Sequence, residues 1–233
     1  MTHYHLWSGI INRSESGTPR KENDPVDGWY ELSEDEKKRL RQILEDAYNA
    51  VCRIFVQFDD PAFRWSKERL RISPERKTYK EIFEDRRKLR KEDEEELRGI
   101  RVLGEYRHKD SVTLYYNNIK DAAGTAPEGG LGNKVYTVIR YVYFHELMHQ
   151  YFDRFDSEKD EMEIEEGLAE FGALYVLDSL VEKGEADAAE LDWTLRHVEG
   201  KYGPLRCYSY GAGLFKRYKA GHQELKNILE AYC

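Results

Sequence analysis

One five-residue segment carries side chains that could bind a metal ion and use it in catalysis. Residues 145 to 149 read His-Glu-Leu-Met-His, in a chain with 7 histidines among 233 residues. On an α-helix, residues i and i+4 lie on one face, so His145 and His149 can direct both imidazoles at a single ion. Glu146 points about 100° away from His145, where it can accept a proton from a metal-activated water. The spacing therefore predicts two metal ligands and a catalytic base.

A second acidic segment can supply a third ligand. Glu166 and Glu170 lie one helical turn apart, and residues 150 to 165 leave sixteen positions after His149 for a turn and an antiparallel return. A catalytic zinc site takes three protein ligands and keeps one position open. One of the two carboxylates can bind the metal while the other accepts the free N–H of a ligand histidine, which fixes the imidazole tautomer.

These two segments together resemble the gluzincins, the zinc peptidases of the thermolysin and aminopeptidase N type. The segment 145–149 is similar to the family's His-Glu-x-x-His motif, and Glu-Gly-Leu-Ala-Glu at 166–170 is similar to its downstream Glu-Gly-x-Ala element. The resemblance implies Glu166 as the third zinc ligand and Glu170 as the group that orients a ligand histidine. The fold we expect is α+β and zincin-like, with a small sheet over the active-site helix and a mostly helical C-terminal half.

A third segment extends the resemblance towards the C-terminus. Tyr-Ser-Tyr-Gly-Ala at 208–212 is similar to the Tyr-x-x-Gly-Ala element of the aminopeptidase branch. There the tyrosine hydrogen-bonds the developing oxyanion, which implies Tyr208 as a stabiliser of the transition state. Tyr210 and His197 are the alternatives for this role. The resemblance covers residues 111–215 as the metallopeptidase core of a single catalytic domain, 1–233, whose residues 1–110 have no assigned role.

Local patterns predict the elements that must position these residues. Ser33 and Glu36 have the spacing of a capping box at the start of a helix. Apolar residues at helical spacing, and runs rich in β-branched and aromatic residues, indicate the other elements. We expect helices over 33–55, 79–97, 136–155, 163–182, 186–199 and 210–232, strands over 100–106 and 111–116, and a flexible glycine-rich loop over 121–134.

Composition narrows the class of protein further. The formal net charge of −8 gives no global basic footprint for nucleic acid. Cys52, Cys207 and Cys233 form no C-x-x-C pair, and no run of about 18 apolar residues marks a membrane helix. We therefore expect a cytoplasmic protein with neither nucleic acid nor a membrane as its partner, and the sequence leaves its oligomeric state open.

The activity predicted from these residues is zinc-dependent hydrolysis of peptide bonds in a peptide or protein substrate. The metal-activated water would lose its proton to Glu146 as general base, and the substrate would lie extended along an edge strand. The alternative is a catalytically silent zinc-binding or regulatory module with the same fold. A metal-independent helical protein with a chance motif is the third interpretation.

Overall fold

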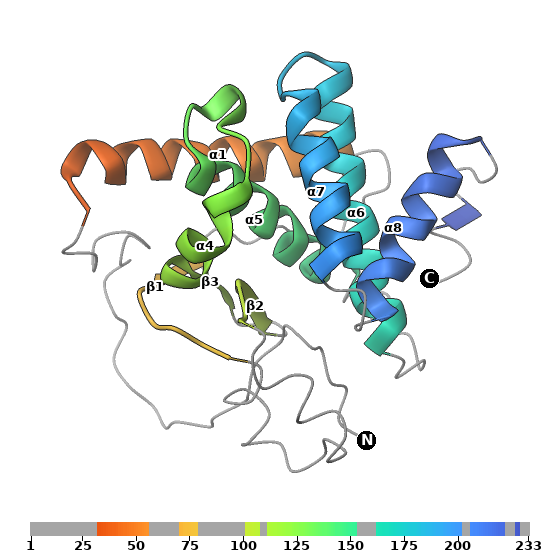
Figure 1. Ribbon diagram of the computed structural model, residues 1–233, viewed down its shortest axis with the longest axis horizontal. Helices are drawn as coiled ribbons and strands as arrows, with labels where there is room; N and C mark the ends of the chain where they lie inside the picture. Colours follow the sequence, from red (N-terminus) through yellow and green to blue (C-terminus); the bar gives the residue numbers. More distant parts are fainter. Residues whose placement is uncertain are drawn as a thin grey trace, which may run out of the picture.

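One central helix contacts other helices and a small sheet, and the two helices that follow in the C-terminal part pack mainly on its helical neighbour (Figure 1). The computed structural model describes residues 32–55, 70–78, 101–107, 111–152, 162–201, 206–221 and 227–228, without the side chains of 125, 162–165, 199–201 and 206–209. The described helices are α1 (Glu34–Phe55), α4 (Tyr116–Ala122), α5 (Lys134–Phe152), α6 (Met162–Glu182), α7 (Ala188–Lys201) and α8 (Arg206–Lys219), with the 3₁₀ turns η2 (Ala123–Thr125) and η3 (Gly129–Leu131). The described strands are β1 (Leu70–Ser73), β2 (Gly104–Arg107) and β3 (Ser111–Tyr115).

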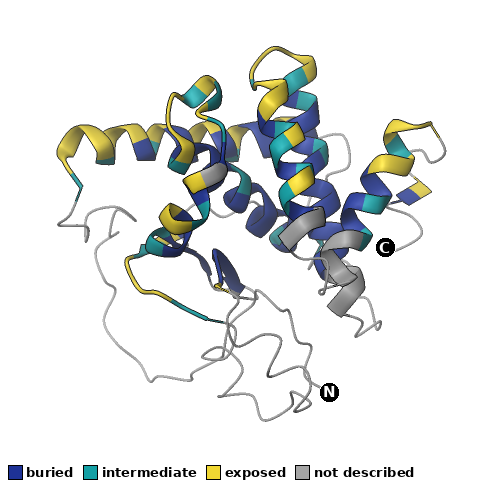
Figure 2. Cartoon of the chain, viewed as in Figure 1, coloured by how far each residue is buried: buried dark blue, intermediate teal, exposed yellow. Residues whose placement is uncertain are grey.

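Helix α5 carries the His-Glu-Leu-Met-His segment and forms the centre of the fold. It packs against α1, α6 and the sheet, so most of its residues are buried, on all of its faces. Figure 2 shows buried residues where these elements meet and exposed residues along the outer side of α1. A helix that is apolar nearly all round is stable only as a core element. The chemistry-bearing residues of α5 are therefore held on a rigid, buried support.

The three described strands form a mixed sheet in the order β1-β3-β2. The central strand β3 runs parallel to β1 and antiparallel to β2, with Val112 opposite both Leu70 and Tyr106. Every residue of β3 is buried. Strand β2 is an outer strand of this sheet and packs against α5. The sheet is small and the rest of the described chain is mainly helical, which agrees with the predicted α+β class.

Helices α6 and α8 pack in close contact because small residues meet at their crossing. A Cβ added to Gly211 of α8 would lie 2.5 Å from the carbonyl oxygen of Gly167 and 2.7 Å from the Cβ of Glu170, both on α6. Contacts this short are essentially never seen for a real side chain, so α8 requires glycine at this position to approach so closely. The stem of Glu170 is thereby held against the backbone of α8.

Several local predictions are confirmed. In the capping box before α1, the N–H of Ser33 donates to Oε2 of Glu36 at 2.8 Å. Helices α1, α6 and α7 lie within two residues of their predicted limits. Helix α5 begins two residues earlier than predicted, after Asn133, whose Oδ1 accepts the N–H of Val135 at 2.9 Å. Strand β2 overlaps the predicted span 100–106 but is shorter, because it starts at Gly104 and ends at Arg107.

Other local predictions are wrong. The predicted loop 121–134 contains the end of α4, both 3₁₀ turns and the first residue of α5, and the N–H of Gly130 donates to the Glu190 carboxylate at 3.1 Å. Residue 116 begins α4 and does not continue the preceding strand. Strand β1 lies in a charged stretch in which no strand was predicted. Helix α8 spans Arg206–Lys219, whereas 210–232 was predicted. The predicted helix 79–97 lies outside the described residues.

No helix in the described part of the chain is both long enough and apolar enough to cross a lipid bilayer.

Candidate metal centre

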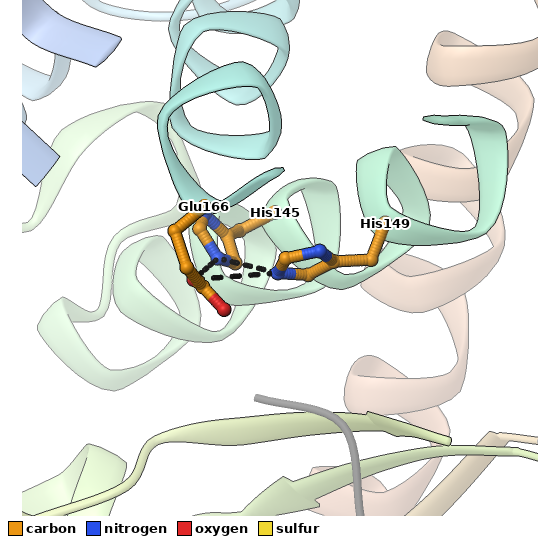
Figure 3. A group of neighbouring side chains, drawn as sticks. All are labelled: His145, His149 and Glu166. Atoms are coloured by element: carbon orange, nitrogen blue, oxygen red, sulfur yellow. Dashed lines mark hydrogen bonds and ion pairs between the residues drawn. The ribbon is translucent and has the colours of Figure 1, made fainter. Parts of the chain in front are cut away.

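The two histidines of α5 and one glutamate of α6 converge at the crossing of these helices (Figure 3). The Nε2 atoms of His145 and His149 lie 3.1 Å apart. The Oε2 atom of Glu166 lies 3.3 Å from Nε2 of His145 and 3.5 Å from Nε2 of His149. All three side chains are buried. Residues from two helices, separated by the 150–165 segment, thus present three donor atoms to one point.

These separations fit a small divalent metal ion. Ligand atoms bound tetrahedrally to zinc at about 2.0–2.1 Å lie roughly 3.3 Å from one another, by the geometry of a tetrahedron. The three observed separations, 3.1, 3.3 and 3.5 Å, bracket that value. Two imidazole nitrogens and one carboxylate oxygen are also a donor set that such ions accept. The cluster could therefore hold a metal ion.

The charges of the site call for a cation. Burial opposes the positive form of His145, yet hydrogen bonds to Glu166 and Glu170 outweigh it and raise its pKa to about 10. Burial likewise opposes the charge of Glu166, but His149 and His145 lower its pKa to about 2. The Glu166 carboxylate therefore stays ionised and attracts positive charge to the imidazoles. A bound metal ion would supply this charge in place of the proton.

Glu170 contacts the other side of the His145 ring. Its Oε2 lies 3.1 Å from Nδ1 of His145, and an ionised carboxylate can only accept, so Nδ1–H is the donor. When His145 loses its second proton to a metal ion, this contact keeps the remaining proton on Nδ1, so that Nε2 presents its lone pair towards His149 and Glu166. The structure thus brings Glu166 next to both Nε2 atoms and Glu170 to the outer nitrogen. This is the arrangement that the sequence resemblance implies for the two glutamates.

Glu146 is fully buried beside this cluster, with 0% of its surface exposed. Among the described residues, neither of its carboxylate oxygens has a hydrogen-bond partner of normal geometry, and the contact from the backbone N–H of Tyr106 offsets only a small part of the cost of burying the charge. Burial raises the pKa of Glu146 well above its ordinary value of 4.5, and this exceeds the opposing effect of His145. A buried carboxyl group without a partner is costly and rare, and such groups are concentrated at functional sites.

Strand β2 provides the space that Glu146 occupies. A Cβ added to Gly104 would lie 2.4 Å from Oε1 of Glu146 and 2.8 Å from Cγ1 of Val142. Two residues further along the strand, the ring of Tyr106 lies parallel to that of His149, with 6.3 Å between their centroids and 5° between their planes. The face of β2 that carries Gly104 and Tyr106 therefore covers α5 at the predicted metal ligands and base.

A mostly apolar pocket opens beside the same residues, between α5 and α7. His145, Glu146 and Glu170 line its polar part. The indole of Trp193 and the imidazole of His197 stack with 4.6 Å between ring centroids and 28° between planes. The remaining lining residues are Leu103, Val138, Tyr141, Val142, Thr194 and Val198. A group bound in this pocket would lie next to both the candidate metal position and the predicted base.

The three candidates for the oxyanion donor fall in different places. Tyr208 belongs to α8, but its side chain lies outside the described part of the structure. Tyr210 is partly buried on the same helix and packs against the hydrophobic core. His197 lines the pocket together with His145 and Glu146. Of the two candidates whose side chains are described, His197 is the one that lines this pocket.

The sequence reasoning did not find three residues of this region. Nothing in the local sequence marks Gly104, because glycine is required there only by the passage of its strand over a helix distant in the sequence. Trp193 also has no local signal, although its i, i+4 spacing to His197 predicts that the two rings meet once α7 is known. Tyr141 could have been found, because it lies four residues before His145 on the same helix face.

The geometry defines a buried site of two histidines and one glutamate, with a further buried carboxyl group next to it. No protein-family model matches the chain, and no curated protein or solved structure is significantly similar to it. Its function is therefore argued from the site alone.

Proposed function

We propose that this chain is a zinc-dependent peptidase with a zincin-like fold, in which His145, His149 and Glu166 bind the metal and Glu146 is the general base. One observation carries the proposal. Three donor atoms at mutual separations of 3.1–3.5 Å lie beside the carboxyl group of Glu146, which is wholly buried and whose pKa burial raises well above its ordinary value. The pair of features matches what metal-assisted hydrolysis requires.

The neighbouring carboxyl group favours hydrolysis over other metal chemistry. Two histidines and one carboxylate bind zinc in hydrolases and also iron in oxygenases, so the donor set does not discriminate between them. A dedicated proton acceptor beside the metal is useful for activating water. Glu146 also argues against the catalytically silent alternative, since a site that only binds zinc gains nothing from a second, fully buried carboxyl group beside the ligands.

The roles of the protein groups follow from their positions. Zinc, when bound, would supply Lewis-acid chemistry, lowering the pKa of water and polarising a carbonyl group. Glu146 would take the proton of the attacking water and hand it to the leaving amine. Glu170 would hold His145 in the tautomer that presents Nε2. Tyr208 is the proposed donor to the oxyanion, with His197 and Tyr210 as the alternatives.

The pocket between α5 and α7 supports a peptide with an apolar side chain as the substrate. Leu103, Val138 and Trp193 contribute apolar contact area to the pocket, and His145 and Glu146 also line it. A side chain bound there would place its own peptide bond next to the base. The peptide itself would lie extended beside β2, in agreement with the sequence prediction of an edge strand at the site.

Metal content and peptide cleavage test the proposal in that order. Purified protein should carry about one zinc per chain, and His145→Ala and His149→Ala should each lose it. Zinc-loaded wild type should cleave a mixture of unstructured peptides, and a chelator should stop the reaction. Absence of zinc would leave the metal-independent interpretation. Zinc without cleavage of any peptide would favour the silent module.

The two downstream glutamates provide a second check on the metal assignment. Glu166→Ala removes a donor atom and should nearly abolish zinc binding. Glu170→Ala removes the partner of His145 Nδ1 and should weaken binding by about 10- to 100-fold. The reverse order of effects would make Glu170 the ligand and displace the assignment by one helical turn.

A further inference from the structure

Tyr141 lies one helical turn before His145 and contacts the same glutamate. Its phenol O–H donates to Oε1 of Glu170, while Oε2 of Glu170 faces Nδ1 of His145. Tyr141, His145 and His149 are spaced by four residues each on α5, so they share one face of that helix. A continuous series of contacts therefore runs from Tyr141 through Glu170 to the imidazole of His145.

The side chain of Glu170 is held both at its stem and at its two carboxylate oxygens. Its stem packs against the backbone at Gly211, where an added Cβ would lie 2.7 Å from its own Cβ and 3.1 Å from its Cγ. Its two oxygens meet Tyr141 and His145 separately. The side chain is buried, so water does not replace a lost partner freely. A carboxylate fixed at both oxygens keeps its plane, whereas one with a single partner can rotate about its last torsion.

We propose that Tyr141 is a positioning residue of the metal centre, which acts through Glu170 to fix the orientation and tautomer of His145. The inference rests on the proposed metal-binding function and extends it beyond the ligands and their direct partners. The phenol adds a donor whose loss leaves a buried carboxylate oxygen unsatisfied. The resulting rotation of Glu170 weakens its contact with Nδ1 and lets the His145 ring move away from the position that binds metal.

The test measures metal affinity and not turnover. Tyr141→Phe removes one hydroxyl group, and zinc affinity is measured by competition with a chromogenic chelator. The matched control is Tyr143→Phe, which removes a buried hydroxyl from the same helix but on the side facing α1, where Tyr48 and Cys52 surround it. We expect Tyr141→Phe to lower zinc affinity by about tenfold, at the low end of the range for direct partners of ligands. Tyr143→Phe should leave it unchanged.

Two further measurements separate positioning from a general loss of stability. In a Glu170→Ala background, Tyr141→Phe should produce no additional loss of zinc affinity, because its route to the metal is gone. In cobalt-substituted protein, Tyr141→Phe should shift the visible absorption bands of the metal, which report ligand geometry, and Tyr143→Phe should not. The thermal midpoint of the metal-free variants is measured alongside to show that each is folded.

The outcomes are distinguishable. Wild-type affinity and an unshifted cobalt spectrum in a folded Tyr141→Phe variant would overturn the inference and leave the metal centre intact. An equal loss of affinity with and without Glu170 would overturn it too, because Tyr141 would then act by another route. A wild-type chain that binds no metal defeats the proposed function, and the inference with it.

Discussion

Replacement of Glu146 by glutamine should remove most of the activity. In the metal-free protein it should also make the variant more stable than wild type, by a difference that grows as pH rises. The side chain is 0% exposed, and its oxygens have no hydrogen-bond partner of normal geometry among the described residues. Glutamine keeps the shape of the side chain and removes both its acidity and its ability to accept a proton. Turnover should fall by about 10²–10⁴-fold, the usual contribution of a general base, while zinc content stays at that of wild type.

The effect on stability follows from the raised pKa of Glu146. Burial raises this pKa well above 4.5, its ordinary value, so the folded protein holds the proton more tightly than the unfolded chain. Between the unfolded and folded pKa values, the native state therefore binds more protons and loses stability as pH rises. The loss is up to about 1.4 kcal/mol for each pH unit in that window and is absent below the unfolded pKa. Glutamine does not titrate, so the variant does not share this loss. The difference in the free energy of unfolding between Glu146→Gln and wild type should therefore widen by the same amount per pH unit.

Urea denaturation of chelator-treated protein at pH 5, 6 and 7 measures this difference. Glu128→Gln, at an exposed glutamate, is the matched control and should follow the wild-type profile. Saturating zinc should shrink the difference, because a nearby divalent cation favours the charged form of Glu146. Parallel stability profiles for wild type and Glu146→Gln would refute the burial argument. Retention of peptidase activity by Glu146→Gln would refute its role as the base.

Three further predictions concern Gly104, Trp193 and the proposed oxyanion donor. Gly104→Ala would place a Cβ 2.4 Å from a carboxylate oxygen of the predicted base, so we expect zinc content near wild type but kcat/KM reduced about 10- to 100-fold in a peptide assay. Gly124→Ala, with nothing within 4 Å of its added Cβ, is the control and should be active. Trp193→Ala should lower kcat/KM about tenfold or more for peptides with a large apolar residue at the cleaved bond, and much less for glycine-containing ones, in a matched peptide series. Tyr208→Phe should lower kcat about 10²–10³-fold without loss of zinc, whereas Tyr210→Phe should matter little, and the opposite result would mean that the family motif is misaligned by two residues.

The sequence was sufficient for the elements whose signals are local. Helix α1 was found from its capping box, in which Ser33 and Glu36 bond to each other, and from an apolar stripe that faces the core. The segment from His145 to His149 predicted its own geometry, because the i, i+4 spacing of a helix fixes which side chains meet. Glu166 and Glu170 were likewise expected on one face of their helix, because four residues make about one helical turn.

The errors arise where tertiary contacts override local preference. Two adjacent tyrosines, Tyr115 and Tyr116, favour a strand, yet the chain turns into α4 between them. Helix α8 was predicted over 210–232 and spans Arg206–Lys219, so both glycines, Gly211 and Gly213, lie in the helix as predicted and the error is in its limits. Gly211 is required because α8 approaches α6 too closely for any side chain. Nothing in the local sequence of α8 reports that approach.

The same limit applies to the surroundings of the candidate site. The motifs predicted the ligands and the base, but not what lies over them. The requirement for Gly104 arises from the passage of β2 across Glu146, and the pocket depends on α7 bringing Trp193 to α5. Both are contacts between residues about forty or more positions apart, which no periodicity encodes.

The pattern of buried charge favours the proposed metal centre over a chance motif in a helical core. Burying several ionisable groups together is costly unless each charge is compensated. In the metal-free chain the compensation comes from the His145 imidazolium, whose pKa is raised to about 10 by its hydrogen bonds to Glu166 and Glu170, against the ionised Glu166. A divalent cation at the point where the three donor atoms meet would replace that proton with a larger charge. It would also bring the pKa of Glu146 down towards the range in which a base works near neutral pH. Zinc binding should therefore release a proton and stabilise the fold, and a core with no use for metal has no reason to hold these groups together.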